Sequence, residues 1–114
     1  MSNERPKPPR PDVRRSPPSS FGWLDARLLH DGWLTELRPE AVAVMALLAI
    51  AADEYGASFY LRESMVGTLA IPRRDLDDCL DRLMQLGLLA HRPWRAGHAD
   101  GVWQLLPLPR RRDR

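Results

Sequence analysis

One stretch of the sequence decides the fold: residues 73–89 read RRDLDDCLDRLMQLGLL. Apolar side chains recur in it at intervals of three and four residues, which is the spacing of one face of an α-helix. The residues of this apolar stripe are Leu76, Cys79, Leu80, Leu83 and Leu86. The pattern predicts an amphipathic helix over residues 73–86 that ends at Gly87. It also places Cys79 in the core, as a small apolar residue and not as a nucleophile.

A β-hairpin is expected directly after this helix. Residues 88–95 and 102–106 have the composition of two strands, and residues 96–101, AGHADG, have that of the turn between them. Trp94 and Trp103 are expected to pack as a cross-strand pair. The alternative for Trp94 is that its ring stacks on a nucleobase.

Shorter elements are predicted upstream of this helix. Helices are expected over residues 24–30, 39–55 and 62–70, and a short strand over residues 58–61. The longest of these helices begins at Pro39, where the missing N–H is harmless in a first helical turn. The predicted fold class is therefore α+β, mainly helical with a small β-hairpin.

The predicted helix over residues 39–55 is apolar on all sides. One face consists of Val44, Leu47, Leu48, Ala51 and Tyr55. The opposite face consists of Val42, Ala46, Ala49 and Ile50. A helix that is apolar all round is buried, so the second face needs cover either from residues 21–33 or from a second subunit.

The two ends of the chain differ in composition from its middle. Residues 1–20 hold six of the eleven prolines and few apolar side chains, which predicts a disordered basic tail. Residues 110–114 form a second basic tail, and residues 21–109 are left to form one domain. Each tail carries a net charge of +3, whereas the middle carries −4.

The sequence contains no pattern typical of an enzyme. His30, His91 and His98 lie in separate segments without partners at zinc-binding spacing, and no glycine-rich phosphate loop follows a strand. The longest apolar run, residues 41–52, is too short to span a bilayer, and the single cysteine fits a reducing compartment. We therefore expect a cytoplasmic, non-enzymatic protein without a metal, a cofactor, a small-molecule substrate or a membrane segment.

The order of these elements, with particular residues in them, resembles the winged helix-turn-helix superfamily. The resemblance is carried by Phe59-Tyr60-Leu61, Leu69-Ala70-Ile71-Pro72, Leu76, Leu80, Leu83 and Leu86-Gly87-Leu88-Leu89. These residues are similar to the family's strand, second helix, tight turn, recognition helix and entry into the wing. Residues 28–37, followed by the alanine-rich helix, are similar to domains of bacterial plasmid or phage replication initiators and mobile-element regulators. The resemblance covers residues 22–107.

The resemblance implies a protein that binds double-stranded DNA and regulates transcription, replication or a mobile element. Residues 73–86 would then be the recognition helix in the major groove, and the hairpin over residues 88–106 would be the wing. The DNA contacts that it implies are Arg73, Arg74, Arg92, Arg95 and His98. Basic tails of this kind follow phosphates or enter the minor groove. Their arginines are Arg10, Arg14, Arg15, Arg110, Arg111 and Arg112.

Of the six helix positions that the resemblance maps as DNA contacts, four are acidic and depart from the family's pattern: Asp75, Asp77, Asp78 and Asp81. Asp77, Asp78 and Asp81 are expected on the solvent side of the predicted recognition helix, where DNA phosphates would repel them. The alternative hypothesis is a protein-interaction module. It would hold a basic partner on this acidic face, and it would form a homodimer or bind a larger protein through another face. The residues of that other face are Val42, Ala46, Ala49 and Ile50.

Overall fold

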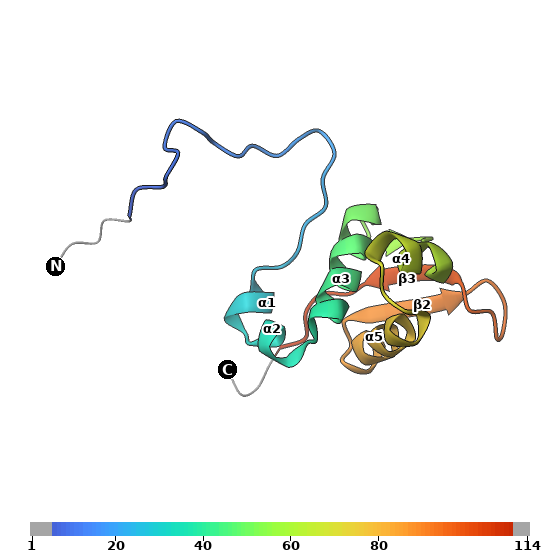
Figure 1. Cartoon of the computed structure of the whole chain (residues 1–114). Coiled ribbons are helices and arrows are strands. Elements are labelled where there is room, and N and C mark those ends of the chain that lie inside the picture. Colours follow the sequence, from blue (N-terminus) through green and yellow to red (C-terminus); the bar gives the residue numbers. More distant parts are fainter. Residues whose placement is uncertain (1–5, 111–114) are drawn as a thin grey trace.

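The computed structural model describes residues 6–110 and shows an α+β domain (Figure 1). In chain order, its elements are α1 (Arg27–His30), α2 (Trp33–Glu36), α3 (Pro39–Ala51), β1 (Ala57–Ser58), α4 (Arg62–Leu69), α5 (Arg73–Gln85), β2 (Leu89–Pro93) and β3 (Gly101–Leu105). Residues 6–20 contain no helix or strand and are exposed throughout. They extend away from the body of the domain.

The three strands form one antiparallel sheet with β3 in the middle, in the order β1-β3-β2. Trp103 of β3 lies opposite Ser58 on one side and opposite His91 on the other. The loop of residues 94–100 joins β2 to β3. In Figure 1 this loop lies at the opposite end of the body from α1.

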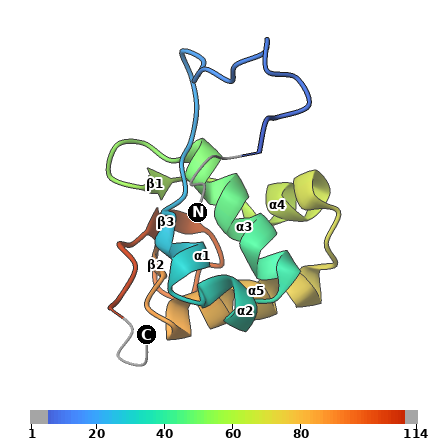
Figure 2. The same ribbon diagram turned by 90° about the vertical axis from the view of Figure 1, so that its left-hand side faces the viewer.

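Helices α3, α4 and α5 enclose the core together with the sheet. Figure 2 shows α3 between α4 and the α1–α2 pair. The side chains with no exposed surface are Val44, Met65, Leu76, Leu80, Leu83, Leu88 and Trp103. The apolar stripe predicted for α5 is confirmed, because Leu76, Cys79, Leu80 and Leu83 are all buried.

Helix α3 ends at Ala51, four residues before the predicted end at Tyr55. The carboxylate of Asp53 accepts the backbone N–H groups of Tyr55 and Ala57, at 2.8 and 3.0 Å. Gly56 follows with a φ of +81°, which glycine adopts at no steric cost. Hydrogen bonds from an aspartate side chain offer the backbone an alternative to the helix. The chain therefore turns here and enters β1.

Two other boundaries differ from the prediction, one beside a local hydrogen bond and the other beside a long-range one. Helix α1 begins at Arg27 and not at residue 24, and the Asp25 carboxylate accepts the Arg27 backbone N–H at 2.8 Å. Strand β1 stops before Tyr60, whose carbonyl oxygen accepts a hydrogen bond from Trp103 Nε1 at 3.0 Å. The one-turn helix α2 was not predicted from the sequence.

The predicted cross-strand pair of Trp94 and Trp103 is wrong. The ring of Trp103 stacks on His91, with centroids 3.8 Å apart. Strand β2 ends at Pro93, so Trp94 lies in the loop and stacks on Phe59, with centroids 5.9 Å apart. The strand register, which no local pattern encodes, decides which aromatic rings meet.

The second face of α3 is covered in part by the segment before it, whereas Ile50 on this face remains exposed. Gly22 lies so close to α3 that a Cβ atom on it would be 2.5 Å from the Ala49 carbonyl oxygen. Ala49 is buried, and so are Leu28 and Trp33 of the covering segment. The sequence left two covers open for this face, residues 21–33 or a second subunit. The structure shows residues 21–33 in contact with it at Ala49.

Candidate nucleic-acid interface

Exposed cationic and aromatic side chains gather on the hairpin of β2, β3 and the loop between them. Arg92, Trp94 and Arg95 are all exposed. His98 is half-buried, and its Nδ1 accepts the backbone N–H of Asp100 at 3.0 Å. Arg92 and Arg95 are thus open to a partner, while one ring nitrogen of His98 is engaged within the loop.

Arg62, the first residue of α4, ties this loop to both neighbouring helices. Its guanidinium donates to Asp77 Oδ1 at 2.6 Å and to the Ala99 carbonyl oxygen at 2.9 Å. Its backbone N–H donates to Asp100 Oδ1 at 2.9 Å. The guanidinium also lies over the Trp103 ring, 5.1 Å from the centroid, and the side chain is only 13% exposed. The loop is therefore held against the start of α4 and the middle of α5.

Asp77 is bound within this network and is therefore not a free carboxylate, although its side chain remains 39% exposed. It accepts hydrogen bonds from Arg62 and from Arg73, whose Nε lies 3.1 Å from Oδ1. Partial burial alone would raise the pKa of the Asp77 carboxyl, but the hydrogen bonds from Arg62 and Arg73 outweigh it and hold the pKa below its ordinary value. Two cations thus offset the charge of Asp77. Because Arg62 lies fifteen positions away, the helical pattern of α5 could not reveal the pairing.

Asp78 and Asp81 take no part in the Arg62 network. They line a hollow of about 350 Å³ between α5 and the start of α3. The other side chains around it are Glu36, Arg38, Ala41, Cys79, Arg82 and Gln85. Within residues 6–110, the carboxylates of Asp78 and Asp81 form no hydrogen bond or ion pair. The three acids expected together are therefore split between two sites.

The first turn of α5 presents two cations to solvent. Arg73 and Arg74 are both exposed. Arg73 shares its charge with Asp77, whereas Arg74 forms no ion pair within the described part of the chain. The free N–H groups and the dipole at a helix N-terminus also favour an anion. This turn is the most cationic part of the helix.

Phe59 and Trp94 form a stacked pair on the surface, and Trp94 lies between Arg92 and Arg95 in the chain. Their planes are 11° apart, and Trp94 remains 54% exposed. The ring is therefore not a core residue packed under the hairpin. Among the expected sites, this one has both a flat aromatic surface and neighbouring arginines.

The predicted tail contacts are only partly within the described residues. Arg14 and Arg15 are exposed in the extended segment, and Arg110 is exposed after β3. Arg10 is exposed as well and pairs with Asp12 at 3.1 Å. The remaining two tail arginines, Arg111 and Arg112, lie outside the described residues.

The face expected to mediate dimerisation is not an open surface. Ala49 is buried under Gly22, Val42 and Ala46 are half-buried, and Ile50 is exposed. Gly22 lies against this face at Ala49 and Ile50, so a partner helix could not pack directly on α3 at that point. A partner approaching this side would meet the covering segment first.

Within residues 6–110, no three histidine, cysteine or acidic side chains are grouped so that they could hold a metal ion. No helix in this range has both the length and the apolar character needed to cross a membrane. Cys79 is buried, and burial raises the pKa of its thiol, which disfavours the reactive thiolate.

Comparison with protein-family models, with curated protein sequences and with solved structures finds no match for the chain. A function for it therefore has to be inferred from its own residues and their geometry.

Proposed function

We propose that the chain is a non-enzymatic winged-helix protein that binds double-stranded DNA and regulates transcription, replication or a mobile element. The observation that carries the proposal is the exposed pair Arg92 and Arg95 on a hairpin held against α5 by Arg62. The element order α3-β1-α4-α5-β2-β3 and the strand order β1-β3-β2 agree with a winged helix. In that assignment α5 is the recognition helix, and the β2–β3 hairpin is the wing.

The charges suggest how such a domain would hold DNA. Phosphate contacts supply most of the affinity of DNA-binding proteins, and Arg92 and Arg95 are placed to make them. Arg74, in the first turn of α5, can donate two hydrogen bonds to a guanine edge. Asp78 and Asp81 lie further along the helix and would be repelled by phosphates. We infer that α5 approaches the groove by its first turn and not along its full length.

Fluorescence anisotropy of a labelled duplex, titrated with the full chain at two salt concentrations, tests this proposal. We expect Arg92→Ala combined with Arg95→Ala to weaken binding of all sequences alike, by about tenfold at low salt. Arg74→Ala should instead relax the preference for one sequence over another. Arg27→Ala is the matched control, because Arg27 is exposed but pairs with Asp25 at 2.7 Å at the far end of the body. Equal affinity of the wild type and the double variant would refute the role of the wing.

A second candidate function rests on the hollow beside Asp78 and Asp81. Two carboxylates without an ion pair next to a concave surface suit a lysine- or arginine-rich peptide. If the chain is an interaction module, Asp78→Asn with Asp81→Asn should abolish binding of such a peptide in a calorimetric titration. Glu63→Gln, which removes an exposed acid from α4, should leave it unchanged. Unchanged binding by the double Asn variant would count against this function.

A further inference from the structure

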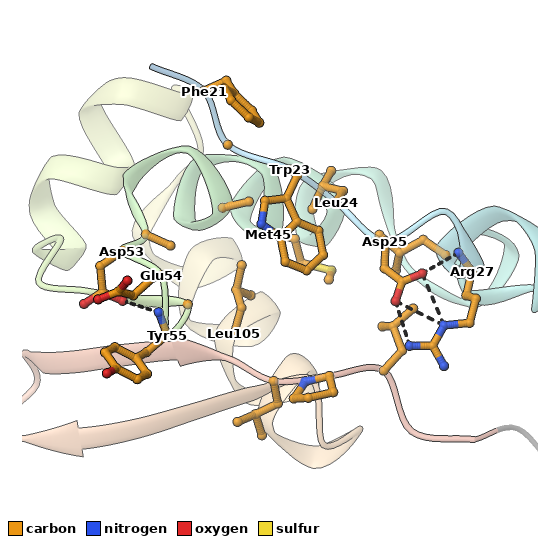
Figure 3. Close-up of a pocket in the computed structure, with 18 residues that line it drawn as sticks. Phe21, Trp23, Leu24, Asp25, Arg27, Met45, Asp53, Glu54, Tyr55 and Leu105 are labelled. Carbon is orange, nitrogen blue, oxygen red and sulfur yellow. Dashed lines mark hydrogen bonds and ion pairs between the residues drawn. The ribbon is translucent and has the colours of Figure 1, made fainter. Parts of the chain in front are cut away.

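An apolar groove lies at the end of the body remote from the β2–β3 loop (Figure 3). Its walls are residues 21–28, the end of α3 with the turn after it, and residues 105–108. Its volume is about 580 Å³. The floor contains Met45, Ala49 and Leu105, and the rim carries three exposed aromatic rings: Phe21, Trp23 and Tyr55. Trp23 is 75% exposed and Tyr55 is 73% exposed, so both rings are open to a ligand.

The rim of the groove is acidic. Asp53 and Glu54 stand beside Tyr55, and Asp25 lies near the other end (Figure 3). Arg27, the one cation among the lining residues, is paired with Asp25 at 2.7 Å. Within residues 6–110, Glu54 has no hydrogen-bonding or ionic partner. The lining residues together carry a net charge of −2.

Exposed aromatic rings next to carboxylates suit a particular kind of ligand. Proline-rich segments bind in aromatic-lined grooves, because their polyproline II conformation is already formed and little entropy is lost on binding. Arginines in such a segment can pair with the carboxylates or lie over the rings. The groove therefore fits an extended peptide that is rich in proline and carries positive charge.

This chain contains such a peptide. Residues 6–18 read PKPPRPDVRRSPP, with six prolines and a net charge of +3. The segment is exposed along its whole length and has no helix or strand. In both whole-chain views it runs outward from the body (Figures 1 and 2), and the chain reaches the groove wall at Phe21.

We propose that the groove binds the proline- and arginine-rich segment of a second copy of the chain. A second copy is the better donor because Pro17 and Pro18 keep the chain extended just before it enters its own groove wall at Phe21. Thirteen residues in a polyproline II conformation span about 40 Å, enough to reach a neighbouring domain. Exchange of the two segments is reciprocal and gives a closed two-fold dimer.

Sedimentation equilibrium of the full chain without DNA tests the proposal. We expect a monomer–dimer equilibrium at moderate salt, which Trp23→Ala weakens by about tenfold or more. Arg14→Glu with Arg15→Glu should weaken it as strongly, because the acidic rim would repel the altered segment. Trp94→Ala is the matched control, since it removes an exposed tryptophan outside the groove. Circular dichroism checks that Trp23→Ala is folded, as expected for a side chain that buries little surface.

Exchanging charges between the groove and residues 6–18 tests whether this segment is what binds in the groove. Glu54→Arg should weaken the dimer, and adding Arg14→Glu with Arg15→Glu to the same chain should restore part of the affinity. A labelled peptide of residues 6–18 should bind the full chain and dissociate the dimer. A chain that stays monomeric at all concentrations overturns the proposal. A dimer that responds to Trp23→Ala but not to the tail variants also overturns it, because another surface would then fill the groove.

Discussion

At the scale of single residues, Arg62 holds the loop of residues 94–100 in place, although Arg62 itself lies on α4 and outside that loop. It is mostly buried and bonds to Asp77 on α5 and to Ala99 and Asp100 in the loop. Of the exposed arginines of the hairpin, Arg95 lies on the loop that Arg62 orders, and Arg92 lies at the end of the strand that leads into it. Arg62 is therefore a positioning residue for the proposed wing.

Arg62→Ala should loosen the loop and expose the charge of Asp77. We expect the free energy of unfolding to fall by about 1–2 kcal/mol, the value for hydrogen bonds to a charged group reduced for the partial exposure of Asp77. Amide hydrogen exchange of residues 94–100 should become faster, and denaturant titration gives the stability. Arg92→Ala, at an exposed arginine, should change neither quantity. Unaltered exchange in Arg62→Ala would show that the loop is held by other contacts.

His91 is a second residue whose role is set by its surroundings. Its ring stacks on Trp103, and its Nε2 is buried without a hydrogen-bonding partner in the described part of the chain. Burial, and then the positive charge of Arg62, lower the pKa of His91 below its ordinary value of 6.5, against a smaller opposing effect of Asp100. The folded state therefore favours the neutral ring.

This lowered pKa predicts that acid destabilises the domain through His91. The contribution of the neutral ring is fully present above pH 6.5, and it is lost as the pH falls from there through the folded-state pKa, because the unfolded chain binds the proton more tightly. Denaturant unfolding at intervals between pH 7.5 and 5 measures it. His91→Phe keeps a flat ring against Trp103 and should flatten this part of the pH dependence. If the stability of the wild type and of His91→Phe falls equally with pH, His91 is not the group responsible.

At the scale of elements, the segment of residues 21–33 completes the domain. Helix α3 is apolar on all sides, so it needs a cover on the side away from α5, and this segment provides it. The contact is close at Gly22, where the α3 backbone leaves no room for a side chain. The same segment forms one wall of the groove. A change that displaces it from α3 should therefore also weaken the proposed dimer.

Gly22→Ala should therefore displace the segment from α3. A Cβ atom there would lie 2.5 Å from the Ala49 carbonyl oxygen, and a backbone shift costs about 1–3 kcal/mol in a packed site. Gly67→Ala is the control, and it should raise the stability of the domain instead of lowering it. Gly67 lies within α4 with no atom near the position of its Cβ, and alanine in a helix interior is favoured by about 1 kcal/mol. Thermal unfolding compares the two, and equal stability of Gly22→Ala and the wild type would argue against close packing.

At the scale of the whole molecule, charge is divided between the body and its ends. The middle of the chain has a net charge of −4, and each tail has +3. The proposed wing and the first turn of α5 are local cationic regions on an acidic body, while the groove is acidic. The arginines of the N-terminal segment therefore have two possible anionic partners, DNA phosphates and the groove of a second copy. Phosphate binding should compete with the dimer for the same side chains.

This division predicts how salt acts on DNA binding. Each phosphate contact contributes about 0.9 to the slope of log affinity against log salt concentration. Replacing Arg14 and Arg15 by Gln should lower the slope by about 2 without changing the preference among sequences. Anisotropy titrations at four salt concentrations measure the slope, with Arg27→Gln as the control. An unchanged slope would mean that the N-terminal segment does not contact DNA.

Local patterns in the sequence determined the main elements of this protein. The stripe from Leu76 to Leu83, Gly87 after it and the turn residues 96–101 predicted α5 and the hairpin correctly, because apolar spacing and turn preferences act over a few residues. The composition also set the proline-rich segment apart from the domain. The end of α3 could not be placed from helical spacing, because the Asp53 turn competes with the helix.

Which of these residues meet is seen in the tertiary structure alone. It placed Trp103 against His91, Trp94 against Phe59, and Asp77 between two arginines. It also showed that residues 21–33 cover α3 and leave an acidic groove beside them. These contacts depend on strand register and on packing between segments far apart in the chain, and the spacing of residues within one element carries no information about either.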